Sequence, residues 1–113
     1  MPHCIIEYSQ KLENEVTPVK LMGAVFKGTL NSNLFEADDI KTRIIPFQHH
    51  LTGGSKQNFI HVILKILSGR SIDQRLALSK SVLSELNKVT STAASLTVEV
   101  VEIEKESYSK VVT

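Results

Sequence analysis

Cysteine, tryptophan, glycine and proline are all scarce in this chain of 113 residues. It contains one cysteine, Cys4, no tryptophan, five glycines and three prolines. A single cysteine excludes an internal disulfide and a cysteine-based metal cluster within one chain. With 42% hydrophobic and 22% charged residues, the composition is typical of a packed globular protein and excludes a collagenous or largely disordered one. The length predicts a single domain over residues 1–113.

The sequence also lacks an excess of charge and a long hydrophobic run. Thirteen Lys and Arg against twelve Asp and Glu give a net charge of +1, so nucleic-acid binding is not expected. The longest apolar stretch, residues 59–67, contains His61 and Lys65 and is far shorter than the roughly 20 residues of a membrane-spanning helix. Glu7 follows the start of the chain too closely for a signal peptide. We therefore expect no membrane span and a cytoplasmic protein.

The first half of the chain has the pattern of a strand, a helix and a second strand. Residues 3–8 are short and rich in β-branched side chains, which predicts a strand. Thr17 and Pro18 suit the N-cap and first position of a helix over about 17–31, in which apolar residues recur every three or four positions. Alternating residues 40–47 predict the second strand.

The second half repeats this order. An apolar strand is expected over 59–67, and Ser71 with Gln74 forms a capping-box pattern at the start of an amphipathic helix. Residues 96–100 alternate and predict the closing strand, whereas 105–113 are polar enough for a tail or an edge segment.

An offset of 58 residues superimposes the strands and helices of the two halves, at about 2–50 and 58–104. The fold class is therefore α+β, a duplicated β-α-β unit forming a four-stranded sheet. Right-handed crossovers place both helices on one face of that sheet. Its other face carries apolar residues of its own, and a further subunit is the natural cover.

The sequence resembles the family of 5-carboxymethyl-2-hydroxymuconate isomerases, part of the tautomerase superfamily. The most specific features are the proline directly after the initiator methionine and the Gly-Arg-Ser junction between strand and helix. The resemblance implies a homotrimer of double β-α-β units in which the free nitrogen of an amino-terminal proline is the acid-base group. It extends to about Ile103 and is carried by residues 1–9, 40–44, 59–71 and 96–100.

Pro2 is the candidate acid-base residue. A methionine followed by a small residue is commonly removed, and the exposed proline nitrogen is then a basic secondary amine. The reference pKa of a free α-amino group is about 7.7 to 8.0, and burial or neighbouring cations lower it toward neutrality. Such a group takes and returns protons at neutral pH. If Met1 is retained, this nitrogen is an amide without useful basicity. Taken without the resemblance, Pro2 is better explained as the start of an edge strand.

Three cations are candidates for holding substrate carboxylates. Lys41 and Arg43 lie two apart on a predicted strand and share a face, although a solvated face explains them equally well. Lys41 stands where the family carries an arginine, and an ammonium cannot give the two-pronged contact of a guanidinium. Arg70 directly precedes a helix N-terminus, which favours an anion. The resemblance gives this arginine a place in the active site.

The histidines are weaker candidates. His3 and His61 could line the site, but lone strand histidines more often serve the structure. His49 and His50 are adjacent on a predicted loop, without the spacing that directs two ligands to one metal ion. No metal site is predicted, and Cys4 is interpreted as a small buried hydrophobic residue rather than a reactive thiol.

The expected function is proton transfer within a small 2-hydroxydienoate or 2-oxo acid, without metal or organic cofactor. Pro2 would move the proton, and Arg70, Lys41 and Arg43 would hold carboxylates and stabilise charge on the 2-oxo oxygen. Two alternatives stay open: a phenylpyruvate-type keto-enol tautomerase, and a trimeric binding protein that has kept the fold but lost activity.

Overall fold

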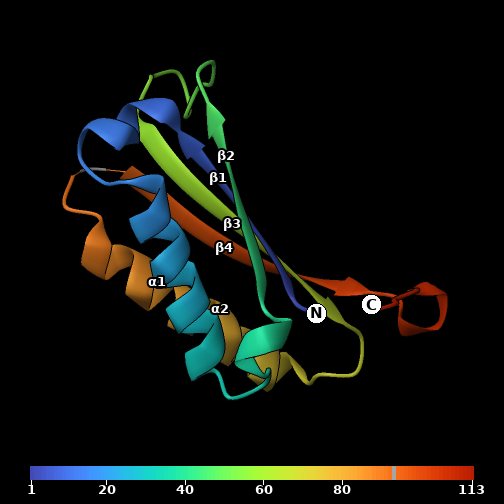
Figure 1. Ribbon diagram of the computed structural model, residues 1–113. Coiled ribbons are helices and arrows are strands. Elements are labelled where there is room, and N and C mark those ends of the chain that lie inside the picture. Colours follow the sequence, from blue (N-terminus) through green and yellow to red (C-terminus); the bar gives the residue numbers. More distant parts are fainter. Residues whose placement is uncertain (93) are drawn as a thin grey trace.

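The computed structural model describes residues 1–92 and 94–113. Its strands and helices follow the order predicted from the sequence, and short 3-10 turns occupy Gln10–Asn14, Ala37–Asp39 and Lys105–Ser107. The closing strand extends beyond the predicted residues 96–100. It covers Ala94–Ile103, because it pairs with the strand Asn58–Leu67 along the full length of that strand. The elements are β1 (His3–Ser9), α1 (Pro18–Asn31), β2 (Lys41–Phe47), β3 (Asn58–Leu67), α2 (Ile72–Val89) and β4 (Ala94–Ile103) (Figure 1).

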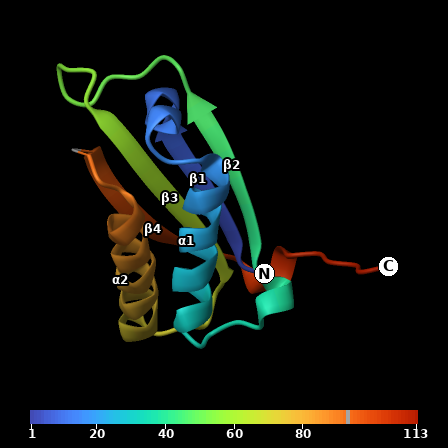
Figure 2. The same ribbon diagram turned by 60° about the vertical axis from the view of Figure 1, so that its left-hand side comes forward.

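The four strands form one mixed sheet in the order β2-β1-β3-β4. Within each half the two strands are parallel, β1 with β2 and β3 with β4, and the halves join through the antiparallel pair of β1 and β3. Both helices cover the same face of the sheet (Figure 2). The predicted duplicated β-α-β unit is therefore confirmed.

The core lies between this face and the helices. Alternate residues of β1 and β3 point into it, and Cys4 is fully buried there, so its interpretation as a small hydrophobic residue is confirmed. Burial raises the pKa of the Cys4 thiol, which makes it less reactive. The fully buried hydrophobic side chains among the described residues are Cys4, Ile6, Tyr8, Leu12, Leu21, Val25, Ile60, Val62, Leu64, Ile66, Leu78, Val82 and Leu86.

The helices begin where the sequence predicts. The Thr17 side chain accepts a hydrogen bond from the backbone N–H of Lys20 at 3.2 Å, and Ser71 and Gln74 form both hydrogen bonds of a capping box. Gly28 lets the two helices approach closely, because a Cβ at this position would lie 2.6 Å from the Cα of Val82.

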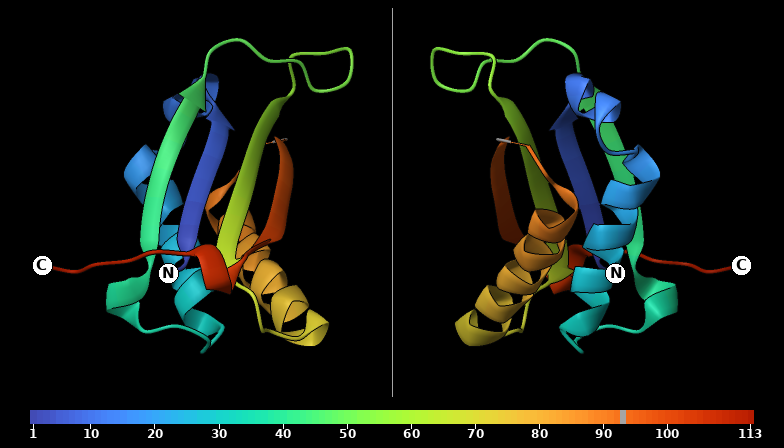
Figure 3. Two further views of the ribbon diagram at one scale, coloured as in Figure 1. Left: turned by 90° about the vertical axis from the view of Figure 1, so that its right-hand side faces the viewer. Right: turned by 90° about the vertical axis from the view of Figure 1, so that its left-hand side faces the viewer.

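Neither α1 nor α2 lies on the opposite face of the sheet, called here the helix-free face. Its residues alternate with the core residues and include His3, Ile5 and Ile63, which mix polar and apolar character. The C-terminal tail, residues 104–113, crosses this side close to the start of β1 (Figure 3). Among the described residues, neither helix combines the length and apolar character needed to cross a bilayer.

Candidate active site

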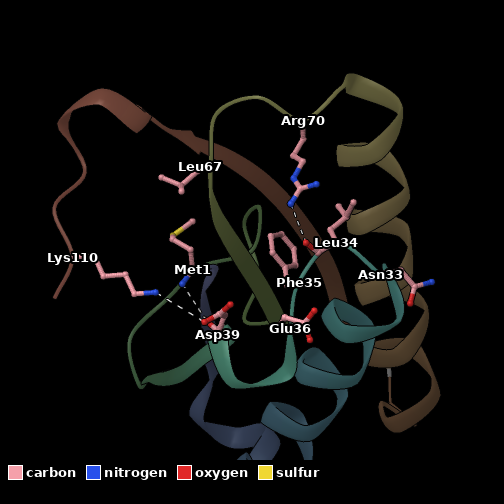
Figure 4. A pocket seen from close by; sticks show the side chains of 9 residues that line it. All are labelled: Met1, Asn33, Leu34, Phe35, Glu36, Asp39, Leu67, Arg70 and Lys110. Carbon is pink, nitrogen blue, oxygen red and sulfur yellow. Dashed lines mark hydrogen bonds and ion pairs between the residues drawn. The ribbon is translucent and has the colours of Figure 1, made fainter. Parts of the chain in front are cut away.

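A pocket of about 400 Å³ lies at the end of the sheet where β1 begins and β3 ends. This volume is within the range of small-molecule sites. The two strand ends meet here because β1 and β3 are antiparallel, with His3 beside Lys65 in the ladder. The pocket is lined by Met1, Asn33, Leu34, Phe35, Glu36, Asp39, Leu67, Arg70 and Lys110 (Figure 4).

Arg70 enters the pocket from the turn between β3 and α2. Gly69 makes this turn with φ of +122°, a conformation that side-chain-bearing residues rarely adopt. Nη2 of Arg70 donates a hydrogen bond to the carbonyl oxygen of Leu34 at 2.9 Å, and its guanidinium lies 5.6 Å from the ring centre of Phe35. These contacts leave a positive charge in a fixed place on the pocket wall.

Arg75 supports this turn from the first helical turns of α2. Its Nε donates to the backbone carbonyl of Arg70 at 3.3 Å, and its Nη1 lies 3.2 Å from a carboxylate oxygen of Glu102 on β4. The turn is therefore tied to both the helix and the sheet. No pattern in the sequence predicts this role of Arg75, because its partner Glu102 lies far along the chain.

The amino end of the chain forms another wall. The Met1 amino group donates to the carbonyl oxygen of Asp39 at 3.1 Å. Burial lowers the pKa of this amino group from 8.0 to about 6, and Lys41 and Lys110 act in the same direction, whereas Asp39 acts against them. An amine with such a pKa is largely unprotonated at neutral pH and is able to accept a proton.

Pro2 lies directly behind Met1 and is buried. Its carbonyl oxygen accepts a hydrogen bond from the backbone N–H of Lys41 at 3.0 Å, which fixes it at the start of the sheet. With Met1 attached, the nitrogen of Pro2 is an amide, and Met1 is the residue that borders the pocket.

Lys41 and Arg43 do not line this pocket in the single chain. The β1–β2 register places Lys41 beside His3 and Arg43 beside Ile5, on the helix-free face. The Nζ of Lys41 reaches the carbonyl oxygen of Asp39 at 3.4 Å, and Nη1 of Arg43 lies 3.3 Å from Nδ1 of His3. Within one chain, Arg70 lines the pocket, whereas Lys41 and Arg43 lie on the sheet.

His3 lies on the helix-free face beside the pocket rather than in its wall. Its Nε2 forms a hydrogen bond with the hydroxyl of Tyr108 at 2.9 Å. Burial lowers the pKa of His3, and the nearby charge of Arg43 lowers it further. The neutral His3 ring contacts both Arg43 and Tyr108. It therefore connects β1 to β2 and to the C-terminal tail.

His61 lies farther along the same face. It contacts Thr97 through Nδ1 at 2.7 Å and Glu99 through Nε2 at 2.5 Å, both on β4. It is six residues from Leu67 of the pocket, about 20 Å along a strand. Within one chain, therefore, His61 belongs to a separate hydrogen-bonded cluster.

The adjacent histidines differ in environment. His49 is exposed, whereas the ring of His50 packs edge-on against Phe59 with centroids 5.0 Å apart. Across residues 1–92 and 94–113, no group of three or more His, Cys, Asp or Glu side chains is arranged to hold a metal ion.

Four charged or aromatic residues that line the pocket were not predicted from the sequence. Phe35, Glu36 and Asp39 lie between α1 and β2, and Lys110 lies in the tail. The segment before β2 has no motif that predicts a place in a pocket, and an isolated lysine in a polar tail carries no pattern that predicts its position.

The fold and the pocket define the chain as a protein of the tautomerase fold. It is similar over its full length to the crystal structure of a 5-carboxymethyl-2-hydroxymuconate delta-isomerase, covering 89% of that chain with a TM-score of 0.84 and 16% identity. The chain also matches the model of the 5-carboxymethyl-2-hydroxymuconate isomerase family over residues 2–111, and it belongs to that family. This confirms the resemblance seen in the sequence and places the chain among isomerases.

Two further solved structures have the same fold. A 5-carboxymethyl-2-hydroxymuconate isomerase from Deinococcus radiodurans R1 is 22% identical, with a TM-score of 0.76 and coverage of 96% of this chain and 87% of that one. A fused 4-OT wild-type symmetric trimer is 13% identical, with a TM-score of 0.74 and coverage of 91% and 86%. Comparison with curated protein sequences gave no significant match.

Proposed function

We propose that the chain moves a proton within a 2-hydroxydienoate or a related 2-oxo acid, as a 5-carboxymethyl-2-hydroxymuconate delta-isomerase does, after removal of Met1. One observation carries this proposal: Arg70 lines the same pocket as Met1, the residue attached to the Pro2 nitrogen, although the two lie far apart in sequence. Removal of Met1 would leave the Pro2 amine at this end of the pocket, and a fixed cation beside a proton-accepting amine is sufficient in principle for this reaction.

In the proposed reaction, the nitrogen of Pro2 removes the hydroxyl proton of the dienol. The electron pair of that O–H bond forms the 2-oxo group, and the conjugated double bonds shift along the chain. The same proton then returns from Pro2 to a carbon of the conjugated system, so no atom is gained or lost. Because the proton is held by the enzyme between the two steps, no cofactor takes part in this scheme.

Arg70 has the role of binding a substrate carboxylate and stabilising negative charge that develops on the 2-oxo oxygen. Its guanidinium still has donors free beyond the one given to Leu34, because arginine carries five N–H groups. A preorganised donor of this kind costs little reorganisation when charge develops.

Lys41 and Arg43 would contribute to a substrate site if the chain forms a homotrimer. The helix-free face, which presents Ile5 and Ile63 beside these cations, is the surface that neighbouring subunits would cover. In that arrangement Lys41, Arg43, His3 and His61 lie near a boundary between subunits and are available as substrate-binding groups there. The similarity of the fold to a symmetric trimer supports this assembly. We propose that the protein acts in the cytoplasm, as expected from the sequence.

The decisive experiment compares two amino-terminal forms of the protein. Intact mass identifies the form that lacks Met1, and an added N-terminal extension that resists trimming keeps the Pro2 nitrogen as an amide. We expect the trimmed form to convert 2-hydroxymuconate-type dienols to their 2-oxo isomers, followed by ultraviolet absorbance. The extended form should be inactive while keeping the same circular dichroism spectrum.

Pro2→Ala provides a second test, because the primary amine differs from proline in basicity and placement. We expect most of the activity to be lost, whereas Pro18→Ala, at the first position of α1, should leave it unchanged. Turnover of phenylpyruvate but no dienol would favour the keto-enol tautomerase alternative. A trimmed protein that converts neither substrate would favour a binding protein of the same fold.

A further inference from the structure

We propose that Lys110, in the C-terminal tail, is a specificity-determining residue that binds a second carboxylate of the substrate, at the opposite side of the pocket from Arg70. This rests on the proposed function of the same pocket. The inference starts from the observation that a residue three positions from the end of the chain lines the pocket together with Arg70 and Met1.

The tail is held in place by side-chain contacts as well as by its connection to β4. The hydroxyl of Tyr108 forms its 2.9 Å hydrogen bond with His3, and the two rings meet edge to face with centroids 6.2 Å apart. The backbone N–H of Tyr108 also bonds to the carbonyl oxygen of Lys105 at 3.4 Å, within a short 3-10 turn. Lys110 follows two residues after this anchor, so its position at the pocket depends on the anchor.

Lys110 has a partner that a ligand is able to replace. Its Nζ lies 4.0 Å from Oδ1 of Asp39, and the two side chains are 44% and 50% exposed. An exposed ion pair at this distance contributes little to stability. A ligand carboxylate that approaches Lys110 therefore competes with a weak interaction rather than a strong one.

The two cations suit different tasks. Arg70 is fixed by Leu34 and Phe35, and its planar guanidinium orients a carboxylate beside the amino end, where the proton moves. Lys110 is a flexible point charge, which fits a distal carboxylate whose orientation matters less. Figure 4 shows the two side chains approaching from different sides, with Met1 drawn between them.

The acidic residues of the pocket make this arrangement selective. Glu36 and Asp39 balance the charges of Arg70 and Lys110, so a ligand with a single carboxylate gains one contact at Arg70 and leaves the Lys110–Asp39 pair in place. A ligand with two carboxylates gains both contacts, provided that its second charge displaces Asp39. Tighter binding of a ligand with two carboxylates therefore depends on Lys110, and Asp39 weakens this binding because it competes for Lys110.

The test measures binding of two non-reacting probes to the trimmed protein by isothermal titration calorimetry. trans,trans-Muconate and sorbate share the same conjugated diene chain, but muconate has a second carboxylate. We expect muconate to bind more tightly, and Lys110→Ala to weaken its binding about tenfold while sorbate binding changes less than about twofold. Lys110→Arg, which keeps the charge, should retain the preference for muconate.

Two further variants make the test specific to this residue. Lys105→Ala removes an exposed lysine of the same tail that does not line the pocket, and it should leave both affinities unchanged. Asp39→Asn releases Lys110 from its partner and should strengthen muconate binding. Equal affinities of wild-type protein for both probes, or an unchanged preference in Lys110→Ala, would overturn the assignment.

The binding role of Lys110 and the proposed isomerase activity are tested separately. Muconate binding that depends on Lys110, in a trimmed protein without isomerase activity, would uphold the second carboxylate site and remove the proposed catalysis. Isomerase activity with a kcat/KM for dicarboxylate dienols that Lys110→Ala leaves unchanged would uphold the catalysis and remove the role of Lys110. If Lys110 acts through binding, its loss raises KM for a dicarboxylate substrate and leaves kcat nearly unchanged.

Discussion

Nη2 of Arg70 donates a hydrogen bond to the backbone carbonyl of Leu34 across 2.9 Å. This contact joins the turn before α2, in the second half of the duplicated unit, to the segment that follows α1 in the first half. The pocket lies between these two segments. The duplication therefore builds one site from both halves.

Replacing Arg70 should affect catalysis far more than folding. We expect Arg70→Ala to lower kcat/KM for dienol substrates by about 10²- to 10³-fold, as loss of a preorganised donor does. Arg70→Lys should recover part of this loss because it keeps the charge but not the planar fork. Steady-state kinetics of the trimmed protein measure both effects. A decrease in melting temperature that fully accounts for the lost activity would contradict this role.

The amino group of the form that keeps Met1 should titrate at about pH 6, well below the ordinary value of 8.0, because it is partly buried and close to Lys41 and Lys110. Selective ¹³C-methylation of the amine followed by NMR titration measures this pKa. Lys41→Met and Lys110→Met should each raise it, since each removes a nearby positive charge. A value near 8 in the folded protein would contradict the environment described.

The same shift links folding to pH. Between about pH 6 and pH 8 the unfolded chain binds more protons at this amine than the folded chain does, so the free energy of unfolding should rise as the pH increases through this window. Urea denaturation at a series of pH values measures the slope. Acetylation of the amino group removes the titrating group and should reduce the slope in this range.

Two glycines of α1 should respond in opposite directions to alanine. Gly28→Ala places a Cβ 2.6 Å from the Cα of Val82 and should destabilise the protein by about 1 to 3 kcal/mol through overpacking of the helices. Gly23 is exposed, and a Cβ there has no heavy atom within 4 Å, so Gly23→Ala should stabilise the protein by about 0.5 to 1 kcal/mol. Chemical denaturation distinguishes the two signs.

The proposed trimer makes a prediction about the helix-free face. Ile63 lies between Ile5 and Glu99 in the sheet, so Ile63→Glu places a carboxylate beside that of Glu99 on a surface that neighbouring subunits would cover. We expect light scattering to give three times the mass of one chain for wild type and the mass of one chain for this variant. Leu83→Glu, on an exposed position of α2, is the matched control and should leave the trimer intact. A wild-type protein that is monomeric at micromolar concentration would contradict the assembly.

The sequence by itself determined the secondary structure and the duplication. Alternation along residues 3–8 and 59–67, the N-cap at Thr17 and the capping box at Ser71 are local patterns, and the structure follows each of them. These features are readable because the residues that create them lie within a few positions of one another. The Gly-Arg-Ser junction also located Arg70 at the start of α2, since strand and helix ends are fixed locally.

Only the tertiary structure decided what surrounds Arg70. The antiparallel pairing of β1 with β3 brings the end of β3 beside the start of β1, so Arg70 and the amino end share a pocket. Lys41 and Arg43 lie outside its lining, on the helix-free face of the sheet. The tail then places Lys110 in that pocket through Tyr108 and His3, which are 105 residues apart. Contacts at such separations depend on the path of the whole chain, and no short-range pattern encodes them.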